Sequence, residues 1–137
     1  MANPFVHIEL GTDDPQKAKQ FYSELFKWQT EESPNPVSGG VYTFIKTGEG
    51  TTGGIFKKPM ADAPNIWLPY VLVDNVENIL KKAHKLGAMV VVERKEVPGM
   101  GAFGIISDPG GAMLGIWENS MSTASIGGTE REGAKPV

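Results

Sequence analysis

The feature that most constrains this chain is an internal repeat. A shift of 61 positions lays the first half on the second and matches eight identical residues without a gap, where background composition would give about three. Self-similarity at a fixed offset indicates a duplicated structural unit. The matched pairs are Asp13–Asp74, Leu25–Leu86, Glu32–Glu93, Gly40–Gly101, Ile45–Ile106, Gly50–Gly111, Gly54–Gly115 and Ile55–Ile116.

The first unit combines one helix with several strands. Residues 5–12 alternate between apolar and polar side chains, which predicts a strand, and helical spacing of apolar residues predicts a helix over 15–27. Residues 32–40 contain two prolines and two glycines and are expected to form a loop. Two further strands are predicted over 41–47 and 53–58.

The second unit repeats this order, so the chain is predicted to be an α+β protein of two tandem βαβββ modules. One four-stranded sheet with one helix buries a single face, and each unit therefore needs a partner against its other face. We expect one domain over 1–119, with module one at about 5–58 and module two at about 66–118. The polar residues 120–137 are expected to form a tail outside the domain.

Composition narrows the possible partners. Thirteen basic and sixteen acidic side chains give a net charge of −3, which argues against a protein that binds nucleic acid or an anionic membrane. No apolar run approaches the ~20 residues that span a bilayer, and the first residues do not resemble a signal peptide. Without cysteine, thiolate ligands and nucleophiles are excluded. We expect a cytoplasmic protein that holds no cofactor.

Three segments carry a family resemblance. They are HIELGTDDPQKAKQFYSELFKW, LPYVLVDNVENILKKAHKLGA and FGIISDPGGAMLGIWE. In their sequence and their order, these segments resemble the vicinal oxygen chelate superfamily. This superfamily includes glyoxalase I, bleomycin-resistance proteins and extradiol dioxygenases. The resemblance implies that the modules form a curved mixed sheet, a cup with the helices outside, and that chemistry occurs inside the cup. It also implies that two chains pair as a homodimer.

The same resemblance places a metal ion at four strand positions. Here they hold His7, Leu68, Gly54 and Gly115, so one ligand of four is present. Since a catalytic cation commonly needs three protein ligands, and Glu9 would supply only a second, we expect no metal site. The glycines are expected to leave extra room for a ligand.

Strand alternation places His7 and Glu9 on one face, where they could contact a ligand, act as a catalytic acid/base pair or belong to a buried hydrogen-bond network. Apolar and aromatic side chains are expected to line the hollow beside them and to suit a small, flat, partly apolar ligand. The predicted ligand-binding residues are Phe56, Leu68, Tyr70, Met113 and Trp117.

The favoured interpretation is a metal-free protein that binds a small molecule and is glyoxalase- or bleomycin-resistance-like in architecture. If it is an enzyme, the resemblance implies a lyase or isomerase related to lactoylglutathione lyase, or a dioxygenase. One alternative is a metal-dependent lyase or dioxygenase whose missing ligands come from a second chain. The other alternative is a non-catalytic interaction domain with a hollow that its own side chains fill.

Overall fold

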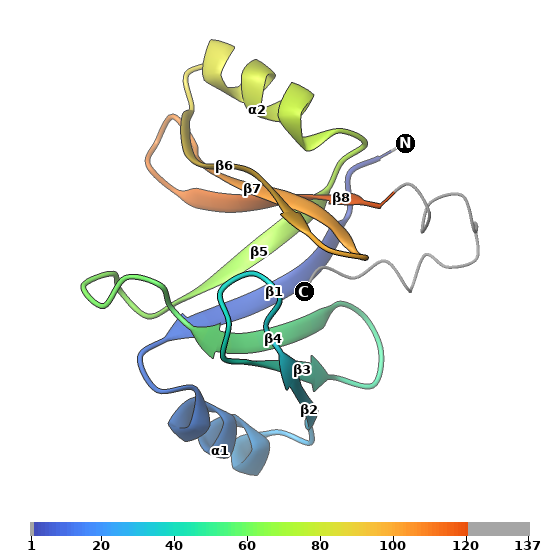
Figure 1. The fold of residues 1–137 in the computed structure, drawn as a ribbon, viewed down its shortest axis with the longest axis vertical. Helices are drawn as coiled ribbons and strands as arrows, with labels where there is room; N and C mark the ends of the chain where they lie inside the picture. The colour runs from blue at the N-terminus through green and yellow to red at the C-terminus, as the bar shows by residue number, and fades with distance from the viewer. Residues whose placement is uncertain (1, 121–137) are drawn as a thin grey trace. The chain divides into compact units, whose positions relative to one another are not determined.

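The structure is a computed structural model, and it describes residues 2–120 (Figure 1). The prediction of an α+β fold with two tandem βαβββ modules is confirmed. The elements are β1 (Phe5–Thr12), α1 (Pro15–Leu25), β2 (Gln29–Pro34), β3 (Val41–Lys46), β4 (Thr52–Lys57), β5 (Ile66–Leu72), α2 (Val76–Lys85), β6 (Met89–Val97), β7 (Gly101–Ser107) and β8 (Met113–Asn119).

The chain forms two compact units, which we call the N-terminal unit (7–68) and the C-terminal unit (2–6 with 69–120). The first residues of β1 thus belong to the C-terminal unit, and the first residues of β5 to the N-terminal unit. The assignment of both modules to one domain over 1–119, and their union in a cup, stay predictions. The tail predicted over 120–137 lies outside the described residues from 121 onward.

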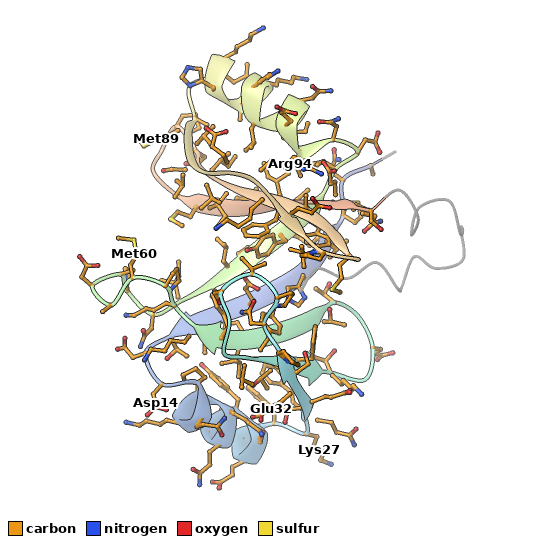
Figure 2. All side chains as sticks on the ribbon, viewed as in Figure 1. Asp14, Lys27, Glu32, Met60, Met89 and Arg94 are labelled. Atoms are coloured by element: carbon orange, nitrogen blue, oxygen red, sulfur yellow. The ribbon has the colours of Figure 1, made fainter. Side chains whose placement is uncertain are left out.

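In the N-terminal unit the strand order is β2-β3-β4-β1. The β1–β4 pair is parallel and the other pairs are antiparallel. Asp14 caps α1, because its side chain accepts a hydrogen bond of 3.1 Å from the Lys17 N–H (Asp14 is labelled in Figure 2). The core of this unit consists of Leu10, Ile45 and Ile55, with Ala18, Tyr22, Trp28 and Trp67 packed against them.

The C-terminal unit has the equivalent order β5-β8-β7-β6, again with one parallel pair, β5–β8. Asn75 caps α2 by accepting from the Asn78 N–H at 2.9 Å. Helix α2 buries Val76 and Leu80 against Val73 and Ile116. In contrast, α1 has no fully buried residue.

One predicted boundary is wrong. Residues 32–34, expected in a loop, belong to β2, which pairs with β3 along its whole length. The sequence of this edge strand, QTEESP, is polar and ends in proline, so it lacks the alternation that identifies a strand. Within residues 2–120, no helix is long and apolar enough to cross a bilayer.

Candidate functional site

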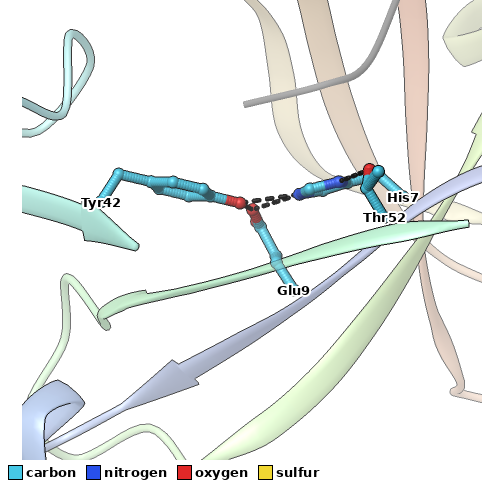
Figure 3. Close-up of polar contacts among 4 residues, drawn as sticks. All are labelled: His7, Glu9, Tyr42 and Thr52. Carbon is cyan, nitrogen blue, oxygen red and sulfur yellow. Dashed lines mark hydrogen bonds and ion pairs between the residues drawn. The ribbon is translucent and has the colours of Figure 1, made fainter. Parts of the chain in front are cut away.

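Four polar side chains, three of them buried, are linked by hydrogen bonds across the sheet of the N-terminal unit (Figure 3). The parallel register of β1 and β4 sets His7 beside Thr52, and the His7 Nδ1 lies 3.2 Å from the Thr52 Oγ1. The His7 Nε2 lies 2.7 Å from the Tyr42 hydroxyl oxygen, Oη. Tyr42 in turn donates a hydrogen bond of 2.8 Å to the Glu9 Oε1. His7 is 0% exposed, Tyr42 2% and Glu9 8%, so these three side chains are largely protected from water.

One tautomer of His7 agrees with the hydrogen bond that Tyr42 donates to Glu9. Because the Tyr42 hydrogen points to Glu9, the Tyr42 oxygen accepts from His7, and Nε2 carries the imidazole proton. In the neutral imidazole Nδ1 then accepts from the Thr52 hydroxyl. In this tautomer, each hydrogen bond from Thr52 through His7 and Tyr42 is donated in the direction of the Glu9 carboxylate. Successive hydrogen bonds of one direction polarise each other.

Tyr42 reaches β1 only because Gly54 has no side chain. In the strand order β3-β4-β1, Tyr42 starts on β3, and β4 lies between it and its partners on β1. Neighbouring strands are about 4.8 Å apart, so the ring must pass over β4. A Cβ atom built on Gly54 would overlap the Tyr42 hydroxyl and ring.

The C-terminal unit uses the equivalent glycine in the same way but with apolar partners. Here the ring of Tyr70, from β5, covers Gly115 on β8, and a Cβ atom at 115 would overlap it. The Tyr70 ring then packs edge-to-face on Phe103 of β7, with 6.2 Å between the ring centroids. By the repeat offset of 61, Phe103 and Tyr70 are the counterparts of Tyr42 and Glu9.

The expectation that the two glycines leave room for a ligand is therefore wrong. The space beside Gly54 and Gly115 is filled by the protein's own tyrosine rings, one in each unit. Close packing explains this result, since a void of that size would forfeit contacts that an aromatic ring supplies.

The donor set does not fit the metal ion that the resemblance implies. Leu68 is apolar, and Gly54 and Gly115 offer no side chain, so His7 is the single family position with a ligating group. Among residues 2–120, no group of three or more His, Asp or Glu side chains could hold a metal ion.

The structure brings the two predicted catalytic residues together, with 3.9 Å between the His7 Nε2 and the Glu9 Oε1. Phe56 is half-buried in the same unit and stacks on Tyr42, at 6.0 Å between centroids. Leu68, at the end of this unit, is buried.

The remaining predicted ligand-binding residues belong to the C-terminal unit. Tyr70 and Trp117 are buried, and the Trp117 Nε1 donates to the Asn119 Oδ1 at 2.9 Å, whereas Met113 is 40% exposed. Direct contact of these side chains with a ligand stays a prediction.

Two of the four hydrogen-bonded residues, Tyr42 and Thr52, were not predicted from the sequence. Thr52 becomes a neighbour of His7 through strand register, which the sequence does not state. A signal for Tyr42 was present, because its module counterpart is the aromatic Phe103 and both modules keep a glycine at the next strand.

Glu118 has a structural role in the C-terminal unit. It lies three residues after Gly115 on β8, so strand alternation predicts that the two residues face opposite sides of the sheet. Its Oε1 accepts a hydrogen bond of 2.7 Å from the Val76 N–H at the start of α2. Its Oε2 accepts one of 2.9 Å from Arg94 of β6. Glu118 thus ties together the helix, the edge strand and β8 of the C-terminal unit.

The sequence matches the Glyoxalase/Bleomycin resistance protein/Dioxygenase superfamily over residues 5–116. It is 32% identical over 114 residues to a protein of Mycobacterium tuberculosis named "Putative glyoxylase CFP32", covering 81% of this chain and 44% of that protein. It is 25% identical over 127 residues to the anthracycline biosynthesis protein DnrV of Streptomyces peucetius, covering 83% and 46%. The chain thus spans less than half the length of these curated relatives.

Solved structures share the fold. Methylmalonyl-CoA epimerase from Mycobacterium tuberculosis superimposes with a TM-score of 0.65 at 15% identity, covering 88% of this chain and 91% of that chain. The hypothetical protein BH1468 from Bacillus halodurans C-125 superimposes with a TM-score of 0.68 at 14% identity, covering 88% and 96%. At such identities the likeness concerns the fold alone.

Proposed function

Because the chain belongs to the glyoxalase/bleomycin resistance protein/dioxygenase superfamily, we propose that it binds a small organic molecule without a metal ion. The observation that carries this proposal is the Tyr42 hydroxyl, which joins His7 to Glu9 by hydrogen bonds of 2.7 and 2.8 Å. With this hydroxyl in place, His7 and Glu9 are organised by protein groups and need no cation to orient them.

Of the two ionisable residues in this hydrogen-bonded group, Glu9 is the one that a ligand would meet first. Its side chain keeps 10% of its exposure, while that of His7 keeps none. A carboxylate accepts hydrogen bonds, and those from charged or polarised groups are the strong ones. We therefore expect the ligand to present a hydroxyl, an amide N–H or an acidic C–H to Glu9.

The binding test uses protein dialysed against a chelator and a set of small organic acids, ketones and flat aromatic compounds. One relative is named for anthracycline biosynthesis, so an anthracycline belongs in the set. A compound at about 100 times its Kd should stabilise the protein by about 2.7 kcal/mol, seen as a higher melting temperature.

Glu9→Gln and Tyr42→Phe are expected to weaken this stabilisation, and Glu24→Gln, an exposed change on α1, should leave it intact. Stabilisation that occurs only when Zn²⁺, Ni²⁺, Mn²⁺ or Fe²⁺ is added back would overturn the proposal. So would a screen in which no compound binds, which would favour the interaction-domain alternative.

The polarised hydrogen bonds also favour a second candidate, metal-independent proton transfer of the lyase or isomerase kind. In it Glu9, which the hydrogen bond from Tyr42 keeps ionised, accepts a proton from a ligand carbon beside a carbonyl group, and the electron pair of the broken C–H bond passes to the carbonyl oxygen as an enolate. Incubation of a bound ligand in D₂O, followed by NMR, should show deuterium at that carbon with the wild type and none with Glu9→Gln. Exchange that persists in Glu9→Gln would remove this candidate.

We also propose that the protein is a cytoplasmic homodimer. Light scattering during size-exclusion chromatography tests the oligomeric state, and a sharp monomer peak at high concentration would contradict it. Fractionation of cells that produce the protein tests its location.

A further inference from the structure

We propose that the Tyr42 hydroxyl occupies the place of a divalent cation, and that Gly54 is the residue that admits it. This inference deepens the proposed function, because it gives a physical reason why ligand binding would need no metal. Tyr42 is a positioning residue here, since it acts by holding His7 and Glu9.

Three side-chain positions converge on one oxygen atom. The His7 Nε2 and the Glu9 Oε1 lie 2.7 and 2.8 Å from the Tyr42 Oη. A side chain at residue 54 would begin at the same point, because its Cβ atom would overlap that oxygen. Residues 7 and 54, two of the positions that the resemblance assigns to a metal ion, thus both face the Tyr42 hydroxyl. Glu9 is the third residue that faces this hydroxyl.

The Tyr42 hydroxyl and a cation compete for the same two side chains. Zn²⁺ lies about 2.0–2.2 Å from nitrogen and carboxylate ligands, so an ion could bind His7 and Glu9 only if the hydrogen bonds of both to the Tyr42 hydroxyl were lost. The ring is also held from its other side, because Tyr42 packs on Phe44 and Phe56 with centroids 4.9 and 6.0 Å away. Tyr42 is 2% exposed and cannot turn aside into solvent without disturbing this packing.

Removal of the phenol together with a donor at residue 54 should therefore create a metal site. The key variant is Tyr42→Ala/Gly54→Glu, which leaves His7, Glu9 and the new carboxylate facing the vacated space. Three protein ligands are the usual number for an open zinc site. Tyr42→Phe, which removes the hydroxyl and keeps the ring, is the matched control.

Each protein is incubated with Zn²⁺, dialysed and analysed for metal content, and its melting temperature is measured with and without Zn²⁺. We expect the double variant to retain about one Zn²⁺ per chain and to melt at a higher temperature with the metal. The wild type and Tyr42→Phe should retain far less and show no shift. Adding His7→Ala to the double variant should abolish retention.

The proposal is overturned if the wild type retains one Zn²⁺ per chain in a His7-dependent way. It is also overturned if the double variant, folded by circular dichroism, retains no more zinc than the wild type. Tyr42→Ala/Gly54→Asp repeats the test with a shorter side chain, and failure of both variants to fold even with Zn²⁺ counts against the proposal. Ligand binding by the chelated wild type is measured separately, so the proposed function and this inference can fail independently.

Discussion

At the residue scale, the Tyr42 ring and hydroxyl occupy the space that a side chain at residue 54 would need. Gly54→Ala places a methyl group inside the ring and hydroxyl of Tyr42. Overpacking of a filled core typically costs about 1–3 kcal/mol. We expect Gly54→Ala to lower the free energy of unfolding by an amount in this range, measured by urea denaturation.

The matched control for this prediction is Gly11→Ala. It lies on the neighbouring strand β1, and its added Cβ atom would meet its nearest neighbours at 3.6 Å, an ordinary contact. Equal losses of stability in the two variants would contradict the account of Gly54 given above.

The four hydrogen-bonded side chains show which part of the site could be predicted from the sequence. His7 and Glu9 lie two residues apart on a strand, so period-two alternation predicts that they share a face. Tyr42 and Thr52 join them from two other strands, and register between strands depends on long-range pairing. The sequence shows that residue 54 has no side chain, but it does not show which aromatic ring packs over that residue.

At the scale of elements, Glu118 stabilises the start of α2. Its Oε1 accepts from the Val76 N–H, one of the N–H groups at a helix start that have no partner inside the helix. Glu118→Ala should lower the free energy of unfolding by about 0.5–2 kcal/mol, as for other lost helix caps, in a urea titration.

Two controls accompany this variant. Arg94→Ala breaks only an ion pair whose arginine is 39% exposed, so it should cost less. Glu77→Ala, exposed in the same first turn of α2, should also cost less. A loss for Arg94→Ala as large as that for Glu118→Ala would assign the effect to the ion pair.

Glu32 links β2 to α1 in a pH-dependent way (Glu32 is labelled in Figure 2). The pKa of its carboxyl is lowered by the hydrogen bond from Gln16 and, after that, by Lys19. A lowered pKa in the folded state stabilises the protein above the unfolded value of about 4.3, and this contribution disappears as the pH falls through the folded value.

The stability difference between the wild type and Glu32→Gln should therefore be present near neutral pH and shrink as the pH falls below about 4. Chemical denaturation across this range measures it. Gln16→Ala removes the largest cause and should reduce the pH dependence of the difference. A difference that grows with acidity would show that the sign is wrong.

Strand β2 also shows where prediction of the elements stopped. Strands with alternating or β-branched sequences, such as β1 and β3, were predicted nearly to the residue. Strand β2 contains two consecutive glutamates, Glu31 and Glu32, and it is a strand because β3 pairs with it. Its state is decided by the neighbour and not by its own side chains.

At the scale of the whole molecule, duplication has produced two units with the same element order and different chemistry. The N-terminal unit holds the polar chain of His7, Tyr42 and Glu9, and the corresponding part of the C-terminal unit holds Tyr70 and Phe103. His7, Tyr42 and Glu9 are joined to one another by hydrogen bonds, and we therefore expect that they need no cation to compensate them.

Treatment with EDTA followed by dialysis should accordingly leave the melting temperature of the wild type unchanged. Calorimetry before and after treatment, with metal content measured on the same samples, tests this prediction. A drop in melting temperature that Zn²⁺ or Ni²⁺ reverses would mean that an ion contributes to the folded state.

The contact between Tyr42 and Gly54 also restricts the routes by which this sequence can evolve. A larger residue at 54 is penalised while the phenol is there, and loss of the phenol alone leaves two donors and an unfilled space. A cation site at this point therefore requires two substitutions, and we expect each of them to be harmful when it occurs first. Such sign epistasis makes the present state hard to leave, and laboratory selection for a metalloenzyme should start from the double variant.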